Sequence, residues 1–283
     1  MLSDRLKSVV SSSSASRGLF GGGYGTDNGT SDRGLFAAGS SSGTYVNTID
    51  YVTISSPGNA TDFGDLWDGL YSPGGCSNGP NDRGVFGGGV GQPWDGGQNT
   101  IGYVTISTTS NTTDFGDLTL ARYALSGCSN GSNERGVFWS GAGDEEAAKI
   151  TIDYITINSA GNASDFGDTG QETMGAGVTS NGTSDRGVSC GGSMSGTWDE
   201  IEYITISSTG NATDFGDLTA ASAGLAATSS GTGDVAVVGA IDSGGINNSG
   251  IDYFTISTTG NASDFGDLSV ARHALAAVSN GLT

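Results

Sequence analysis

The sequence predicts an all-β fold, a five-bladed β-propeller in which each blade is a four-stranded antiparallel sheet. One stretch is written five times in the 283 residues, and its copies begin 52, 51, 49 and 50 residues apart, a period typical of repeat architectures. The copies begin at Tyr51, Tyr103, Tyr154, Tyr203 and Tyr253. Each unit holds four short apolar segments separated by Gly, Asn and Ser turns. Such units must stack on their neighbours to bury their apolar side chains.

The repeats divide the chain into an N-terminal arm and one repeat-built body. Residues 1–31 are the least regular part, and within them the segment that begins Arg17-Gly18-Leu19-Phe20 resembles a partial repeat. The propeller is expected over 32–283. Its parts are expected near 32–66, 67–118, 119–168, 169–218 and 219–268, with a closing strand over 269–283.

Within each unit, the first expected strand is an Arg-Gly segment that ends in small residues, such as 83–89. The second has the pattern Ile-Asp-Tyr-x-Thr-Ile and is apolar on both faces, which predicts a sheet covered on both sides. The third is Asp-Phe-Gly-Asp-Leu. The fourth is an Ala-Arg-containing segment that leads to Asn-Gly, a dipeptide typical of hairpin turns.

The end of the chain is expected to close the ring. The strand predicted over 270–281, with Ala271, Arg272 and Leu275, has no unit of its own to complete. We expect it to complete the N-terminal blade as a clasp, which leaves no open sheet edge. The segment from Leu19 to Tyr24 could compete for the same place. In that case the C-terminal strand is free to insert into another copy, and strand donation would build a fibre.

The order of these elements resembles a kelch-type β-propeller blade. A strand that ends in paired glycines, a variable loop, a tyrosine strand, a polar turn and an Ala-Arg strand follow the kelch order over residues 18–283. A phenylalanine stands where kelch repeats usually have a tryptophan. The Gly-Asn-Ala-Thr-Asp-Phe-Gly-Asp-Leu repeats are also similar to those of repeat proteins of cyanophages and marine phages. That similarity implies a role in a virus particle.

Composition excludes several classes of partner. The net charge is −20, from 30 acidic and 10 basic residues, and such a field repels nucleic acid and anionic lipid. No apolar run is long enough to span a membrane. The first residues lack the pattern of a signal peptide, so an extracellular location would need another route, such as cell lysis. Three cysteines show neither a disulfide framework nor metal spacing.

A repeated pair of aspartates is the strongest candidate for chemistry. Two carboxylates three residues apart could contribute to a calcium site, which needs six to eight oxygen ligands. The pairs are Asp62 and Asp65, Asp114 and Asp117, Asp165 and Asp168, Asp214 and Asp217, and Asp264 and Asp267. No further ligand recurs at loop spacing, so we expect structural roles. One aspartate would cap a turn and the other would meet an arginine of the Arg-Gly strand. Calcium is the only cofactor that the sequence suggests.

No residue pattern nominates an enzyme. The single histidine, His273, occupies the place that Tyr123 has in another unit, which favours packing over catalysis. Binding is expected where the repeats differ, in variable loops that carry Tyr45, Trp94 and Trp198. We therefore expect a non-enzymatic structural or adhesive virion component that contacts other virion proteins, itself or host glycans. A lectin-like propeller and an extracellular fibre subunit joined by strand donation are the alternatives.

Overall fold

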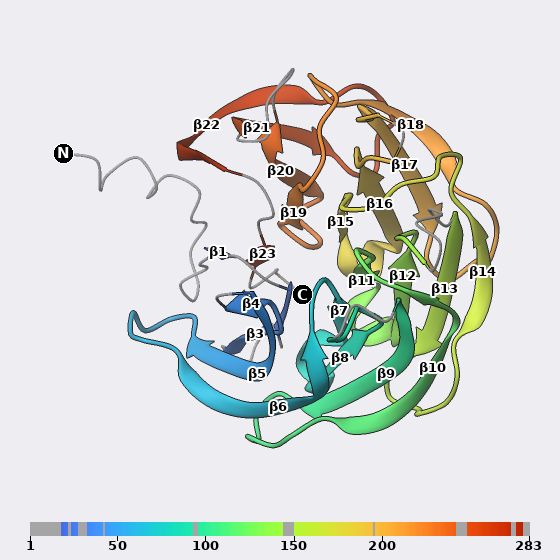
Figure 1. Ribbon diagram of the computed structural model, residues 1–283. Coiled ribbons are helices and arrows are strands. Elements are labelled where there is room, and N and C mark those ends of the chain that lie inside the picture. The colour runs from blue at the N-terminus through green and yellow to red at the C-terminus, as the bar shows by residue number, and fades with distance from the viewer. Residues whose placement is uncertain are drawn as a thin grey trace.

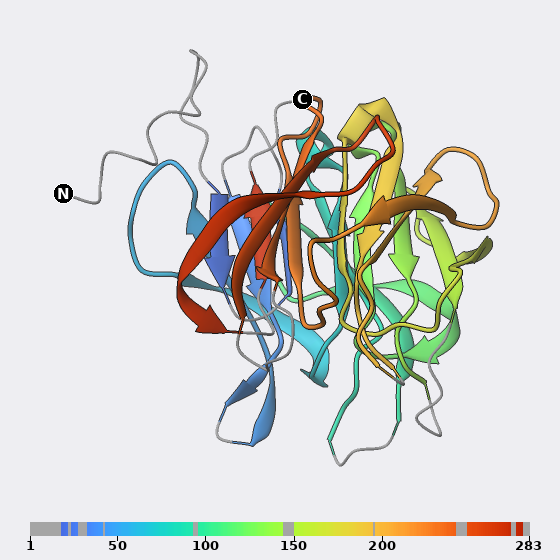
Figure 2. The ribbon, with the colours of Figure 1, turned by 90° about the horizontal axis from the view of Figure 1, so that it is seen from above.

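The computed structural model describes residues 18–21, 24–27, 33–41, 43–92, 96–143, 150–194, 196–241, 248–272 and 276–279. Within these residues there is no α-helix, and five four-stranded antiparallel sheets surround a common axis as the blades of a propeller (Figure 1). The five-bladed all-β prediction is therefore confirmed. Seen from the side, the blades form a single thick disc with loops at both ends (Figure 2).

Each blade follows the chain from an inner strand near the axis to an outer strand at the rim. The first blade contains β2 (Tyr24–Asp27), β3 (Arg33–Ala37), β5 (Thr44–Thr53) and β6 (Thr61–Leu70), with β4 (Ser40–Ser41) as a short hairpin on β5. The second contains β7 (Gly74–Ser77), β8 (Arg83–Gly87), β9 (Gln98–Thr105) and β10 (Thr113–Arg122).

The other three blades repeat this order. The third contains β11 (Ser126–Ser129), β12 (Arg135–Trp139), β13 (Thr151–Thr156) and β14 (Ser164–Asp168). The fourth contains β15 (Gly177–Ser180), β16 (Arg186–Cys190), β17 (Glu200–Thr205) and β18 (Thr213–Asp217). The fifth contains β19 (Ala226–Ser229), β20 (Val235–Ile241), β21 (Asn248–Thr255) and β22 (Ser263–Arg272).

The Asn-Gly segments form the turns between the first two strands of a blade. In three blades the turn is a short 3₁₀ helix: η3 (Gly79–Asn81), η4 (Gly131–Asn133) and η6 (Gly182–Ser184). An acidic residue in the left-handed region ends each one, and Asp82, at φ 69°, is the first of them. The side chain of Asn78 also accepts a hydrogen bond from the Arg83 amide at 2.8 Å. Asn-Gly therefore makes the expected hairpin, with a local side-chain bond that fixes its ends.

The apolar core lies between the blades. Each of the four hydrophobic clusters joins side chains from two consecutive blades. Between the first two blades, for example, Phe63 and Leu66 of β6 pack with Phe86 and Val104 of the second blade. A single blade therefore buries its apolar faces only against its neighbours, as the repeat pattern predicts.

The ring is closed by a sixth, smaller sheet that both ends of the chain supply. β1 (Gly18–Gly21) pairs antiparallel with β23 (Ala276–Ser279). β23 contacts the inner strands β19 and β2 on its two sides, so six inner strands surround the axis (Figure 1). A C-terminal strand closes the propeller, as predicted.

The details of the closure differ from the clasp that the sequence suggests. The inner place of the first blade belongs to β2, and the C-terminal strand does not join that sheet. Leu19 and Tyr24 do not compete with the closing strand either, because Leu19 lies opposite Val278 in β1 and Tyr24 begins β2. An Arg-Gly segment sits beside the inner strand in the first four blades, and β1 takes the same position beside β23.

Candidate functional site

The four junctions between consecutive blades use the same backbone contacts. A turn from one blade lies across the Asp-Phe-Gly-Asp strand of the blade before it, and its asparagine Oδ1 accepts a hydrogen bond from the second aspartate's amide. These donor and acceptor pairs are Asp65 and Asn111, Asp117 and Asn162, Asp168 and Asn211, and Asp217 and Asn261, at 3.1–3.2 Å. The residue after the asparagine donates its amide to the same aspartate's carbonyl at 2.7–2.8 Å. The repeated Asn and Asp therefore hold the blades together.

The glycine of each Asp-Phe-Gly-Asp strand lets this turn approach closely. At Gly216, which has φ +146°, a Cβ atom would lie 2.5 Å from the carbonyl carbon of Gly260 in the next blade. Real Cβ atoms do not tolerate such a distance, and this φ is itself unfavourable for other residues. The glycine is therefore required twice, by its backbone conformation and by its neighbour.

The arginines of the Arg-Gly strands reach into the next blade. In the first four blades the guanidinium stacks over the tyrosine ring of its own blade, 4.2–4.5 Å from the centroid. It also donates to an isoleucine carbonyl of the following blade at 2.9–3.1 Å. The arginines are Arg33, Arg83, Arg135 and Arg186. Val235 takes this position in the fifth blade.

The predicted aspartate pairs do not gather a metal-binding cluster. Asp114 and Asp264 each accept a hydrogen bond from the glycine amide two residues later, a local contact within β10 and β22. We expected the second aspartate to contact an arginine. In the first four blades the arginine stacks on a tyrosine ring instead, as described above. In the part of the chain that the structure describes, no three His, Cys, Asp or Glu side chains lie close enough to hold a metal ion.

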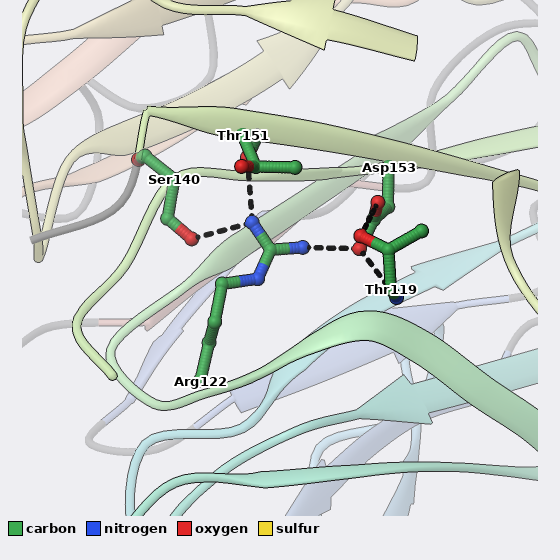
Figure 3. Close-up of polar contacts among 5 residues, drawn as sticks. All are labelled: Thr119, Arg122, Ser140, Thr151 and Asp153. Carbon is green, nitrogen blue, oxygen red and sulfur yellow. Dashed lines mark hydrogen bonds and ion pairs between the residues drawn. The ribbon is translucent and has the colours of Figure 1, made fainter. Parts of the chain in front are cut away.

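One junction contains a buried ion pair (Figure 3). Arg122, at the end of β10, donates from Nη2 to Oδ2 of Asp153 at 2.6 Å, and both side chains are fully buried. The same guanidinium donates from Nη1 to the carbonyls of Ser140 and Thr151 at 2.9 and 2.5 Å. Thr119 donates its hydroxyl to the other oxygen of Asp153 at 2.5 Å. Burial lowers the pKa of the Arg122 guanidinium, while Asp153 partly offsets this effect. The pair joins the second and third blades.

At the other junctions, the residue at the position of Asp153 and the residue at the position of Thr119 change together. Thr219 donates to Asp252 between the fourth and fifth blades. Between the first two blades, Trp67 takes the position of Thr119, and Gly102 takes the position of Asp153. A Cβ atom at Gly102 would lie 2.8 Å from the Trp67 ring, so the large side chain fills the space that the acid leaves.

The fifth blade leaves the corresponding face open. Phe265 is 57% exposed, whereas Phe63, Phe115, Phe166 and Phe215 at the same position are 2–3% exposed. A Cβ atom at Gly266 would meet nothing within 4 Å. Tyr253 and Val270 are also exposed on this blade. We name this surface, formed by Tyr253, Phe265, Gly266 and Asp267, the open face. Its residues have the same sequence pattern as those of a closed junction, so the repeat pattern alone could not reveal that this face is exposed.

The aromatic residues predicted for the binding loops lie in different surroundings. Tyr45 is half-buried and stacks on Tyr71, with ring centroids 5.5 Å apart. Trp198 is half-buried too, and its buried indole N–H has no hydrogen-bond partner among the described residues. Trp94 lies outside the described residues. The structure does not bring Tyr45 and Trp198 into one site, because they belong to the first and fourth blades.

The residues predicted for the closing strand lie elsewhere. Ala271 and Arg272 belong to β22, the outer strand of the fifth blade, where Arg272 lies opposite Asn248. The closing strand itself begins at Ala276. The prediction is wrong here because the apolar pattern runs on through the connection between the outer strand of one blade and the inner strand of the next. His273 and Leu275 lie outside the described residues.

The cysteines are buried in the junctions. Burial raises the pKa of the Cys128 thiol to about 12. Burial also raises the pKa of Cys76 and Cys190 above the usual thiol value. Since the thiolate is the reactive form, these cysteines are packing residues rather than nucleophiles.

The fold and its junctions define the chain as a five-bladed β-propeller with a two-stranded sheet in a sixth position. A comparison with known protein families found no matching family. A search of curated protein sequences found no significant match. None of the described helices is long and apolar enough to cross a membrane.

Proposed function

We propose that this propeller is a non-enzymatic structural or adhesive protein that acts through contacts with other proteins. The open face of the fifth blade carries the proposal. Tyr253 and Phe265 are exposed side by side on this sheet, and grouped exposed apolar side chains commonly mark a surface that contacts another protein. A face that is buried four times elsewhere in the same molecule is well suited to a protein contact.

The polar residues of the repeats support the same proposal. The Asn, Asp, Arg and Thr side chains that recur along the chain bind neighbouring blades, which leaves few of them for chemistry. The buried Arg122 and Asp153 pair is enclosed by backbone carbonyls and Thr119, so a substrate could not reach it. These arrangements support a scaffold rather than an enzyme.

The proposed setting is a virus particle outside the cell. It rests on the kelch-like order of the strands and on the similarity of the repeats to those of phage proteins. The partners would be other virion proteins or further copies of the chain, and no nucleic acid or membrane is involved. No cofactor is part of the proposal.

The setting is tested by antibody labelling of purified particles from the virus or organism that encodes the chain. Gold-labelled antibodies against the propeller should decorate one location on the particle, as seen by electron microscopy. Pre-immune antibodies provide the control. Label found only in fractions free of particles would contradict a role in the virion.

A second candidate, glycan binding, is favoured by the stacked pair of Tyr45 and Tyr71. Tyr71 is 39% exposed, and the face of an exposed aromatic ring suits a sugar ring. Binding to a glycan array by the unchanged protein, lost in Tyr71→Ala and kept in Leu120→Ala, would support it. Leu120 is an exposed residue of β10 and serves as the control. An array without any bound glycan would exclude the candidate.

A further inference from the structure

The sixth position of the ring is only half built by the described residues. In each complete blade the second strand pairs with the inner strand at one edge and with the tyrosine strand at the other. β1 pairs with β23 at one edge, and no described strand pairs with its other edge. In Figure 1, β1 and β23 lie close to the axis between the fifth and first blades, and no coloured strand lies outside them. Among the described strands, none fills the places of the tyrosine strand and the Asp-Phe-Gly-Asp strand at this position.

The described residues leave the outer half of the sixth position unfilled, and we call this space the vacancy. The open face lies on one side of it. Elsewhere, the phenylalanine and glycine at these places are covered by the turn that joins the tyrosine strand to the Asp-Phe-Gly-Asp strand of the next blade. Ser269 stands where Thr219 stands in the fourth blade, which donates to the carboxylate of Asp252 in the next tyrosine strand. No turn, asparagine oxygen or carboxylate of the described residues takes these places at the open face.

The first blade forms the other side of the vacancy. Ala60, which follows Asn59 in its turn, is exposed, whereas Thr112, Ala163, Ala212 and Ala262 at the same place in the other four blades are half-buried. In the other four blades the same turn lies on the outer strand of the preceding blade. Asp50 of β5 is only half-buried, whereas Asp153 and Asp252 at the same position are buried against threonine donors. In the part of the chain that the structure describes, no outer strand precedes the first blade.

We propose that the vacancy accepts a two-stranded β-hairpin supplied by another protein chain. The hairpin carries a tyrosine strand that adds to the free edge of β1, a Gly-Asn turn that covers Phe265, and an outer strand that receives the Asn59 turn. This inference rests on the proposed function, because it names the kind of partner that such a protein would bind. Strand addition of this type gains main-chain hydrogen bonds along the free edge and specificity from side-chain pockets.

The contacts between blades favour a hairpin, rather than a whole second copy of the chain, as the occupant of the vacancy. β1 and β23 already fill the inner half of the sixth position, so a complete blade of another propeller would collide with them. A net charge of −20 also makes two copies repel each other. A hairpin fills only the outer half, where the four closed junctions show the contacts that it would make.

The experiment uses a fluorescently labelled synthetic peptide with the sequence of residues 151–168, which covers β13 and β14. It contains the carboxylate of Asp153, the tyrosine strand, Asn162 and an Asp-Phe-Gly-Asp strand. We expect it to bind the full chain with one peptide per chain in fluorescence anisotropy. Replacement of the turn asparagine in the peptide, Asn162→Ala, should weaken binding, because it removes the acceptor for the Asp267 amide.

Two substitutions in the chain test the location of the site. Phe265→Ser should weaken binding about tenfold or more, since it removes the largest apolar group of the open face. Val235→Arg should strengthen it about threefold, because it restores the arginine that in four blades stacks on the tyrosine and donates to the next blade. Leu120→Ser, on the rim of the second blade, removes a similar exposed apolar side chain and should leave binding unchanged.

Three results would overturn the inference. The first is the absence of binding at peptide concentrations up to the millimolar range. The second is binding that Phe265→Ser and Val235→Arg do not change. The third is a self-associated chain whose oligomers dissociate on Phe265→Ser but not on addition of the peptide, which would make a second copy the occupant. The third result would leave the proposed structural function intact, so the two proposals can fail separately.

Discussion

The junction between the fourth and fifth blades and the open face of the fifth blade contain the same residue types in different surroundings. Phe215 is 3% exposed and Phe265 is 57% exposed, although both stand in the sequence Asp-Phe-Gly-Asp-Leu. Each also lies edge-on to a tyrosine ring of its own blade, with centroids 6.1 and 5.7 Å apart. Burial of a repeat therefore depends on the neighbouring repeat. The same substitution can therefore be compared at a covered position and at its uncovered counterpart.

The largest difference is expected for the two phenylalanines. Phe215→Ala should lower the free energy of unfolding by about 3–5 kcal/mol, because it leaves a cavity in the core. Phe265→Ala should change it by less than about 0.5 kcal/mol, since water already reaches the ring. Urea denaturation followed by tryptophan fluorescence measures both. Equal losses for the two variants would show that the open face is covered within the chain.

Arginines at the ends of two outer strands form the second pair. Arg122→Ala leaves Asp153 buried without its ion pair, which should cost about 3 kcal/mol. Arg272→Ala should cost less than about 0.5 kcal/mol, because Arg272 is partly exposed and its guanidinium donates to the nearby Val270 carbonyl rather than to a buried carboxylate. The same denaturation measurement applies. A small effect at Arg122 would mean that the pair is not enclosed as Figure 3 shows it.

A smaller difference is expected for two turn asparagines. Asn211→Ala removes the acceptor for the Asp168 amide and should cost about 1 kcal/mol. Asn59→Ala should be close to neutral, because none of the described strands precedes the first blade as an outer strand. Thermal unfolding followed by circular dichroism compares the two variants. An equal fall in Tm would contradict the assignment of the first turn as free.

The smallest effect on stability is expected for a probe placed at the open face. Ser269→Cys should leave the unfolding curve unchanged, and its thiol should react rapidly with a disulfide reagent at pH 8. The native thiol of Cys128 should react only as the molecule opens, because burial raises its pKa to about 12. Labelling rates followed by mass spectrometry distinguish the positions. An introduced thiol that reacts as slowly as the native ones would contradict an accessible face.

Much of the fold follows from local sequence patterns. The tyrosine strands, the Asn-Gly turns and the need of each unit for neighbours are properties of about fifty residues, and the copies repeat them. The joint replacement of threonine by Trp67 and of acid by Gly102 cannot be read from one repeat, because the two residues belong to different blades. It becomes clear only when the register between blades is known.

The closure and the candidate site depend on contacts between distant parts of the chain. The Arg-Gly-Leu-Phe segment marks β1 as a second strand, but its inner partner comes from the other end of the chain. Only residues 22 and 23 separate β1 from β2, whereas the complete blades place two more strands in that interval. This short spacing was the available signal for an incomplete sixth position. The exposure of Phe265 had no local signal, because its sequence is that of a buried residue.

The most direct test is hydrogen exchange of two backbone amides, measured by NMR on the chain alone. The Asp217 amide donates to Asn261 of the next blade, whereas the equivalent Asp267 lies on the open face. We expect strong protection of the Asp217 amide and rapid exchange of the Asp267 amide, and the Asp267 amide should become protected when the hairpin peptide binds. Equal and strong protection of both amides in the free chain would contradict an open face on the fifth blade.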